Sequence, residues 1–64
     1  MNGGHVKFKI KRADNGEFYW TCVAANGETL STSETYKNRL DAEHAIKLVK
    51  ALAANAPIED ETSP

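Results

Sequence analysis

The 64-residue sequence lacks three features that would suggest a membrane or secreted protein. It has no apolar run near the roughly 18 residues needed to cross a membrane. Its first residues, Met1 to His5, do not form the apolar stretch of a secretory signal. It has a single cysteine, Cys22, so no disulfide can form within the chain. We therefore expect a cytoplasmic protein of one domain, with no membrane among its partners.

An excess of positive charge is also missing. Eight Lys and Arg residues are balanced by nine Asp and Glu residues, which gives a formal net charge of −1. A protein that binds nucleic acid through its charge usually carries a clear positive excess. The balance therefore argues against nucleic acid as a partner, although it leaves room for a local basic stripe.

No grouping of residues predicts a catalytic, metal or cofactor site. The carboxylates of residues 59–61 lie in a polar stretch with no apolar setting that would shift a pKa. His5 and His44 lack a convergent set of further ligands, and the four glycines do not form a phosphate loop. Cys22 has apolar neighbours and no basic group nearby, which favours a small buried side chain over a reactive thiol. The sequence predicts a protein that is not an enzyme and uses no cofactor.

Three stretches predict the strands of an antiparallel meander. Residues 6–12 alternate between apolar and basic side chains, and residues 18–25 are rich in aromatic and small apolar ones. Residues 29–33 are polar and partly β-branched, which predicts a third, weaker strand. Asp14-Asn15-Gly16 and Ala25-Asn26-Gly27 lie between the strands and have the composition of turns.

The register of these strands must place the apolar residues on one face. Two-residue turns would scatter them, whereas three-residue turns with a left-handed glycine align them. The partners of Trp20 are then Ile10 and Thr32, and Leu30 faces Cys22. Trp20 is expected in the core, because exposing it as a ligand platform would break the alternation. The predicted apolar face consists of Val6, Phe8, Ile10, Trp20, Cys22, Ala24 and Leu30.

One amphipathic helix is predicted over residues 39–54, with Asn38 as its N-cap and Pro57 beyond its end. Its apolar stripe has spacings of three and four residues and would cover the apolar sheet face. The stripe consists of Ala42, Ile46, Val49 and Ala53.

The helix has more apolar surface than three short strands would cover. Ala45, Leu48 and Leu52 widen the apolar arc to about 160° on an ideal wheel of 100° per residue. A surplus of this kind on a small domain indicates a partner surface. Alternatively, the C-terminal segment through Ile58 folds back over it. That segment is acidic, and it predicts either a tail or a short edge strand around Ile58.

The opposite face of the predicted sheet is rich in lysine. Lys7, Lys9 and Lys11 lie in register with residues 19–23, which include Tyr19. Lysines beside an aromatic on an open sheet can bind single-stranded nucleic acid by charge and stacking. The alternative is a solvated face that discourages aggregation at the sheet edge. These four residues are the candidate site for an anionic ligand.

Several short motifs occur together in an order and spacing that cover residues 6–57. They are Gly16-Glu17-Phe18-Tyr19-Trp20, Ala24-Ala25-Asn26-Gly27-Glu28, Thr32-Ser33-Glu34-Thr35-Tyr36-Lys37, and in the helix Ile46 and Val49-Lys50. In these motifs the chain resembles the YegP-like family of small uncharacterised domains. The resemblance implies a β-β-β-α-β unit that works in pairs, either as tandem repeats or as a homodimer with exchanged C-terminal strands. It implies no catalytic residues.

Together these observations predict an α+β fold, a three-stranded antiparallel meander packed on one helix. The domain would occupy residues 1–57, and residues 58–64 would form an acidic tail or an exchanged edge strand. The single repeat implies a homodimer. Its predicted interface consists of Ala45, Leu48, Leu52 and Ile58.

Overall fold

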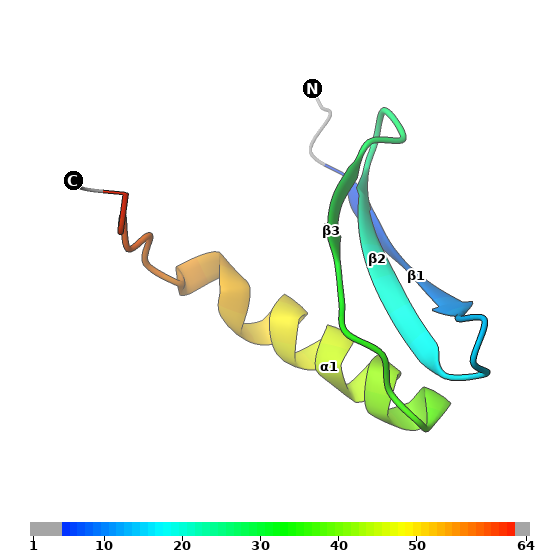
Figure 1. Cartoon of the computed structure of the whole chain (residues 1–64). Coiled ribbons are helices and arrows are strands. Elements are labelled where there is room, and N and C mark those ends of the chain that lie inside the picture. The colour runs from blue at the N-terminus through cyan, green and yellow to red at the C-terminus, as the bar shows by residue number, and fades with distance from the viewer. Residues whose placement is uncertain (1–4, 63–64) are drawn as a thin grey trace.

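A computed structural model describes residues 5–62 and confirms the predicted fold class. Three antiparallel strands form one sheet in the order β1-β2-β3, and the helix lies against one face of it (Figure 1). The elements are β1 (Val6–Arg12), β2 (Phe18–Ala24), β3 (Thr29–Thr32), α1 (Arg39–Leu52) and the 3-10 turn η1 (Ala53–Asn55).

Both hairpin turns have the predicted three-residue form with a left-handed glycine. Gly16 has a φ of +85° and Gly27 a φ of +91°, a region that L side chains rarely adopt. In the first turn the Gly16 amide donates to the Ala13 carbonyl over 2.9 Å, and the Ala13 amide donates to the Glu17 carbonyl over 2.7 Å. The side chain of Asn15 accepts from the Glu17 amide at 2.9 Å. The second turn repeats this arrangement.

The register between β1 and β2 is the predicted one, whereas the register between β2 and β3 is not. Ile10 lies opposite Trp20, and each residue of β1 has the expected partner. Between β2 and β3 a bulge adds one residue, so Leu30 does not face Cys22 and is 55% exposed. Thr32 consequently pairs with Thr21 rather than with Trp20. Counting from the turn fails here because a bulge changes the register without changing the turn.

The segment between β3 and α1 is fastened to β2 by backbone and side-chain hydrogen bonds. The Trp20 amide donates to the Ser33 hydroxyl over 2.9 Å, and the Ser33 amide donates to the Trp20 carbonyl over 2.9 Å. Phe18 and Tyr36 exchange two further backbone bonds of 2.8 and 2.6 Å. These bonds place the start of the helix beside the first residues of β2.

The core is centred on Trp20, as predicted, and it is small. Trp20 packs with Ala42 and Ile46 of the helix, and its ring meets Phe8 edge-on with centroids 5.4 Å apart. Among the described residues no large side chain is less than 2% exposed. The indole N–H of Trp20 is buried and has no hydrogen-bond partner. A buried donor without a partner costs about 1–3 kcal/mol, which further limits the stability of this core.

The helix begins at the predicted residue but ends earlier and is capped differently. Asn38 occupies the N-cap position, yet its side chain makes no capping bond and donates instead to Asp41 Oδ2 at 3.3 Å. After Leu52 the chain tightens into η1, and Ala56 is extended. The residue before a proline disfavours the helical region, which explains the end of the helical segment. No helix among residues 5–62 is long and apolar enough to span a membrane.

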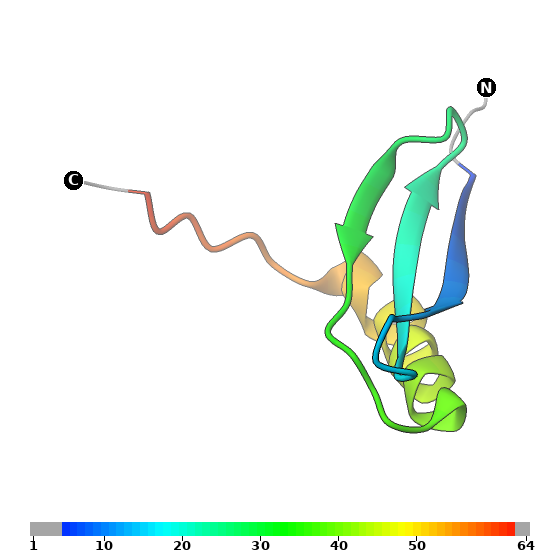
Figure 2. The ribbon, with the colours of Figure 1, turned by 45° about the vertical axis from the view of Figure 1, so that its right-hand side comes forward.

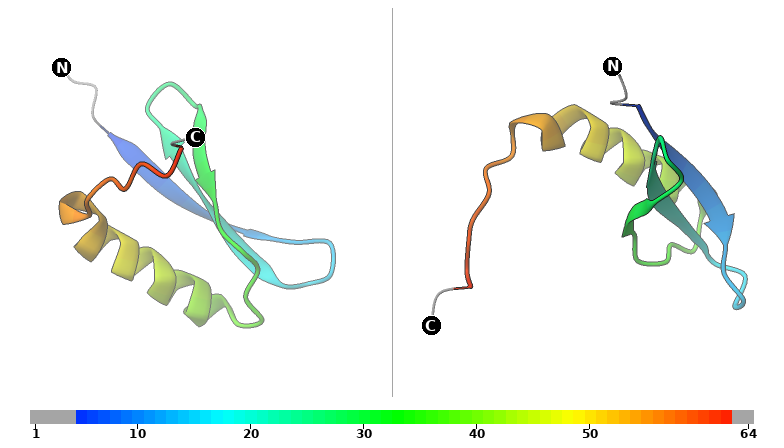
Figure 3. Two further views of the ribbon diagram at one scale, coloured as in Figure 1. Left: turned by 60° about the vertical axis from the view of Figure 1, so that its left-hand side comes forward. Right: turned by 90° about the horizontal axis from the view of Figure 1, so that it is seen from above.

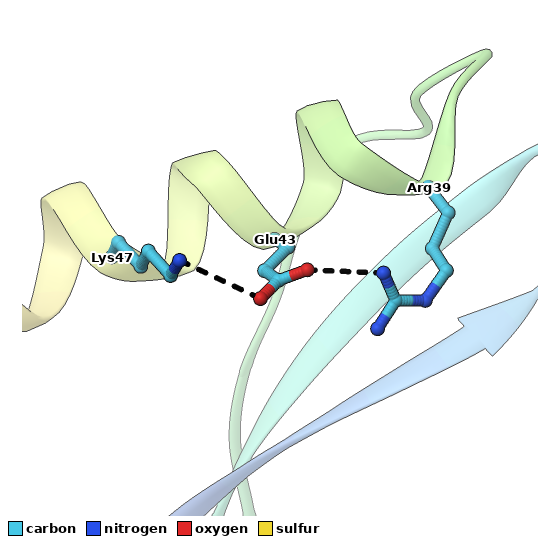
Figure 4. Close-up of polar contacts among 3 residues, drawn as sticks. All are labelled: Arg39, Glu43 and Lys47. Carbon is cyan, nitrogen blue, oxygen red and sulfur yellow. Dashed lines mark hydrogen bonds and ion pairs between the residues drawn. The ribbon is translucent and has the colours of Figure 1, made fainter.

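A row of ion pairs runs along the helix beside its buried stripe (Figure 4). Glu43 accepts from Arg39 over 3.0 Å and lies 3.6 Å from the ammonium group of Lys47, each one helical turn away. The hydrogen bond from Arg39, followed by the attraction of Lys47, holds the pKa of Glu43 below its usual value. The pairs are exposed, so their contribution to stability is small.

The helix and the sheet form a wedge rather than two stacked layers. The first turns of α1 lie against β2, and the later turns diverge from the sheet (Figure 1). Burial follows this geometry, because Ala42 and Ile46 are buried whereas Val49 and Leu52 are exposed. The helix therefore covers only part of the apolar sheet face, which is a correction to the prediction that it covers all of it.

Candidate functional site

An apolar groove of about 670 Å³ occupies the open side of the wedge. It lies between the inner face of β1 and β2 and the second half of the helical segment, whose separation from the sheet is visible in Figure 3. Its lining is Val6, Lys7, Phe8, Ile10, Cys22, Ile46, Val49, Lys50, Ala53 and Ala54.

The chemistry of this groove suits an apolar group with negative charge nearby. Both charged residues of the lining, Lys7 and Lys50, are lysines, and the lining contains no carboxylate or imidazole. Cys22 is a half-buried free thiol there, with no acid–base partner in the groove. General acid–base and nucleophilic chemistry both use such a partner. Within residues 5–62 no three His, Cys, Asp or Glu side chains lie close enough to hold a metal ion.

The predicted dimer-interface residues lie on the other flank of the helix. Ala45 is half-buried and packs against the core. Leu48 is 48% exposed and Leu52 66%, and the two are one turn apart. Ile58 is 96% exposed in the segment 56–62, which forms no helix or strand and runs away from the sheet (Figures 1 and 2). The predicted exchange of this segment stays a prediction, as does the interface.

The sequence pattern did not reveal the groove, nor that Val6 and Val49 line it instead of packing against each other's element. Val6 was counted as covered, yet it is 52% exposed because it pairs with Ala24 at the end of the sheet away from the helix start. The Phe18–Tyr36 bridge fixes where the helix starts, and no periodicity encodes the angle at which it then leaves the sheet.

The candidate anion site on the opposite sheet face is present as a surface. Lys7, Lys9 and Lys11 are exposed, and Tyr19 is half-buried beside them. Thr21 and Val23 of the central strand are buried between the lysines of β1 and the residues of β3, with 5% and 6% exposed.

Comparison with known proteins places the chain in a family. The family model described as "Domain of unknown function (DUF1508)" matches residues 13–60, three quarters of the sequence. The chain belongs to the DUF1508 family. The UPF0339 protein Atu0232 of Agrobacterium fabrum is 40% identical over 57 residues, covering 89% of this chain and 92% of the relative. The UPF0339 protein YegP of Yersinia pestis is 36% identical over 58 residues, 91% of this chain and 47% of YegP.

Solved structures show the same fold for this DUF1508 domain. The solution structure of ATU0232 from Agrobacterium tumefaciens, 40% identical, superimposes with a TM-score of 0.76 over 91% of this chain and 94% of that one. A protein from Haloferax volcanii, 24% identical, gives a TM-score of 0.80 over 89% and 97%. The YegP-like resemblance is therefore confirmed. The chain spans nearly all of some relatives and about half of others, such as PA0329 of Pseudomonas aeruginosa.

Proposed function

We propose that this DUF1508 domain is a non-enzymatic association module that works as a homodimer, in which a second copy covers the groove. The observation that carries the proposal is the open apolar groove beside a core of only a few buried side chains. Small domains with thin cores commonly gain stability from a partner subunit.

The exposed area of the chain supports a partner of its own size. The accessible surface is 5209 Å², whereas a compact monomer of 7.0 kDa exposes about 4,000 Å². The chain thus exposes about 1,200 Å² more than a compact monomer of its mass. A standard interface covers about 800 Å² on each partner, so the excess is enough for one.

The segment around Ile58 has the chemistry that the groove would accept. Ile58 is an isolated apolar side chain followed by the acidic residues 59–61, and the charged residues of the groove, Lys7 and Lys50, are both basic. Extended at about 3.3 Å per residue, residues 56–61 reach about 20 Å. We propose that Ile58 of each copy enters the groove of the other, with Leu48 and Leu52 packing at the same interface.

The lengths of the relatives agree with a working unit of two copies. Some relatives have about the length of this chain, and others have about twice its length. A dimer of a short chain and a single long chain would then supply equivalent units.

Sedimentation of the full chain over a dilution series tests the proposal. We expect a species of twice 7.0 kDa at high concentration. Val6→Asp and Ile58→Asp should each shift it to the monomer, because each puts a carboxylate where an apolar contact is proposed. Both sites are at least half exposed, so the fold tolerates the change.

Leu40→Asp is the matched control. Leu40 is 71% exposed and belongs neither to the groove nor to the predicted interface, so this variant should remain dimeric. A monomer of wild-type chain at millimolar concentration would overturn the proposal. If the wild-type chain is a monomer and its groove becomes exposed only in Ile58→Asp, the segment 56–62 instead folds back into the groove of its own chain.

A further inference from the structure

The sheet face away from the helix carries three cations and no acids. In the register of the sheet its side chains are Lys7, Lys9, Lys11, Tyr19, Thr21, Val23, Thr29 and Thr32. The chain as a whole has one more acid than base, so the positive charge here is a local feature. The helix lies on the other face, and nothing in the described chain covers this one (Figure 2).

The three lysines are free to meet a ligand. All three are exposed, and among residues 5–62 no carboxylate lies within ion-pair distance of their ammonium groups, in contrast to Lys47 on the helix. An ammonium group that makes no internal pair keeps its hydration and its counterions, and it can release those counterions to a phosphate.

The lysines lie in a line, which favours an elongated ligand over a compact one. Residues two apart on a strand are about 6.7 Å apart, so the line from Lys7 to Lys11 is about 13 Å long. Single phosphate ions need convergent donors, whereas a chain of phosphates meets successive donors along one direction.

Hydroxyl groups continue the polar surface across the sheet. Thr21 lies between Lys9 and Thr32, is 5% exposed, and has a buried Oγ1 with no hydrogen-bond partner. Because Thr21 pairs with Lys9 across β1 and β2, this orphaned oxygen is on the strand next to the middle lysine. It is buried, so a ligand oxygen seated beside Lys9 would supply its missing partner only after the side chains over it move aside.

We infer that this face binds the backbone of single-stranded nucleic acid. Lys7, Lys9 and Lys11 contact successive phosphates, and Tyr19, at the Lys11 end, offers its ring to a base. A three-stranded sheet is about 10 Å wide before its side chains are counted, too wide for the major groove of a duplex. A membrane surface is disfavoured, because basic clusters that hold lipids have about four to eight cations and this face has three.

This inference does not depend on the proposed homodimer. The groove opens on the helix side of the sheet, whereas the lysine line lies on the face away from the helix. The two share Lys7, so a covered groove leaves Lys9 and Lys11 accessible. The Val6→Asp variant separates the two ideas, because it breaks the proposed interface and should bind nucleic acid as the wild-type chain does.

Fluorescence anisotropy with labelled oligothymidylate is the experiment. The full chain should bind it with a logarithmic salt slope of about −2, from about 0.7 for each of three phosphate contacts. Lys9→Glu should weaken binding and reduce the magnitude of the slope to about 1.4 or below. Lys9→Arg should keep the affinity and the slope of the wild-type chain. Tyr19→Leu should weaken binding without changing the slope, because stacking releases no counterions.

Lys37→Glu is the matched control, since it makes the same change of charge at an exposed lysine outside the sheet. An equal loss in Lys37→Glu would show that only net charge matters and would overturn the inference. Absence of binding at low salt would also overturn it. So would a preference for phosphatidylserine vesicles over the oligonucleotide, which would assign the face to a membrane surface.

Discussion

Ser33 illustrates how a family motif can encode structure rather than chemistry. It lies in the Ser-Glu-x-Tyr string before the helix. In the structure its hydroxyl accepts from the Trp20 amide over 2.9 Å and donates to the Glu34 carbonyl over 2.7 Å. The first bond holds the segment 33–36 against β2, and the second lies within that segment. The hydroxyl is therefore committed to the backbone, with no proton left for another reaction.

Replacing Ser33 with alanine should destabilise the domain by about 1–3 kcal/mol, because the partly buried Trp20 amide loses its acceptor. Ser31→Ala, at an exposed serine of β3, should cost less than about 0.5 kcal/mol. Urea unfolding of both variants at one protein concentration measures the difference. Equal stabilities would mean that water replaces the Ser33 hydroxyl.

The helix is stabilised along its flank as well as by its buried stripe. Its N-cap lacks the side-chain bond that Asn38 was expected to make, so one stabilising contribution is missing. The ion pairs of Glu43 with Arg39 and Lys47 lie in the first half of the helix and partly compensate. Exposed pairs of this spacing contribute little each.

These pairs predict a specific dependence on pH. Because the folded-state pKa of Glu43 is lowered, its contribution to stability is present at neutral pH and is lost as the pH falls through that pKa. Arg39→Gln removes the largest cause and should move the pKa of Glu43 back up toward its usual value. NMR titration of the Glu43 carboxyl carbon measures the shift. A pKa that is the same in both proteins would show that the pairs do not form in solution.

Strands and helix could be predicted where local pattern and turn chemistry agree. The alternation in β1 and the left-handed glycines together allow a single register with β2, and that register is correct. In β3 the prediction failed at Leu30, because an exposed edge strand buries little and tolerates a bulge. The helix end was misplaced because no glycine marks it, and its last turn tightened instead.

The shape of the whole molecule depends on the angle between the helix and the sheet, which no local sequence pattern specifies. Sequence periodicity correctly identifies apolar faces on both the sheet and the helix. It does not specify that they meet at Trp20 and then separate, leaving apolar surface on both. The sequence pattern placed the uncovered apolar surface on the helix flank at Leu48 and Leu52. It did not reveal the groove beside Val6. The existence of a partner surface could thus be predicted from the sequence, but its position could be predicted only in part.

The groove contains a natural reporter of its own occupancy. Cys22 is the single cysteine of the chain, it lines the groove, and it is half-buried rather than enclosed. A thiol reagent of moderate size should therefore reach it in an isolated copy. If a second copy covers the groove, the same thiol becomes inaccessible, and the fraction protected follows the fraction dimerised.

We expect the alkylation rate of Cys22 to fall as protein concentration rises, and to fall in the same way in the Leu40→Asp control, which should remain dimeric. In Val6→Asp and Ile58→Asp the rate should stay high at every concentration, because the proposed cover is absent. Intact-mass spectrometry of quenched samples reads one site without ambiguity, since the chain has one thiol. In this scheme, access to the groove limits the alkylation of Cys22. If the chain sediments as a dimer but its alkylation rate does not change with protein concentration, the interface does not cover the groove. Pairing would then rest on the exposed flank at Leu48 and Leu52 without the groove.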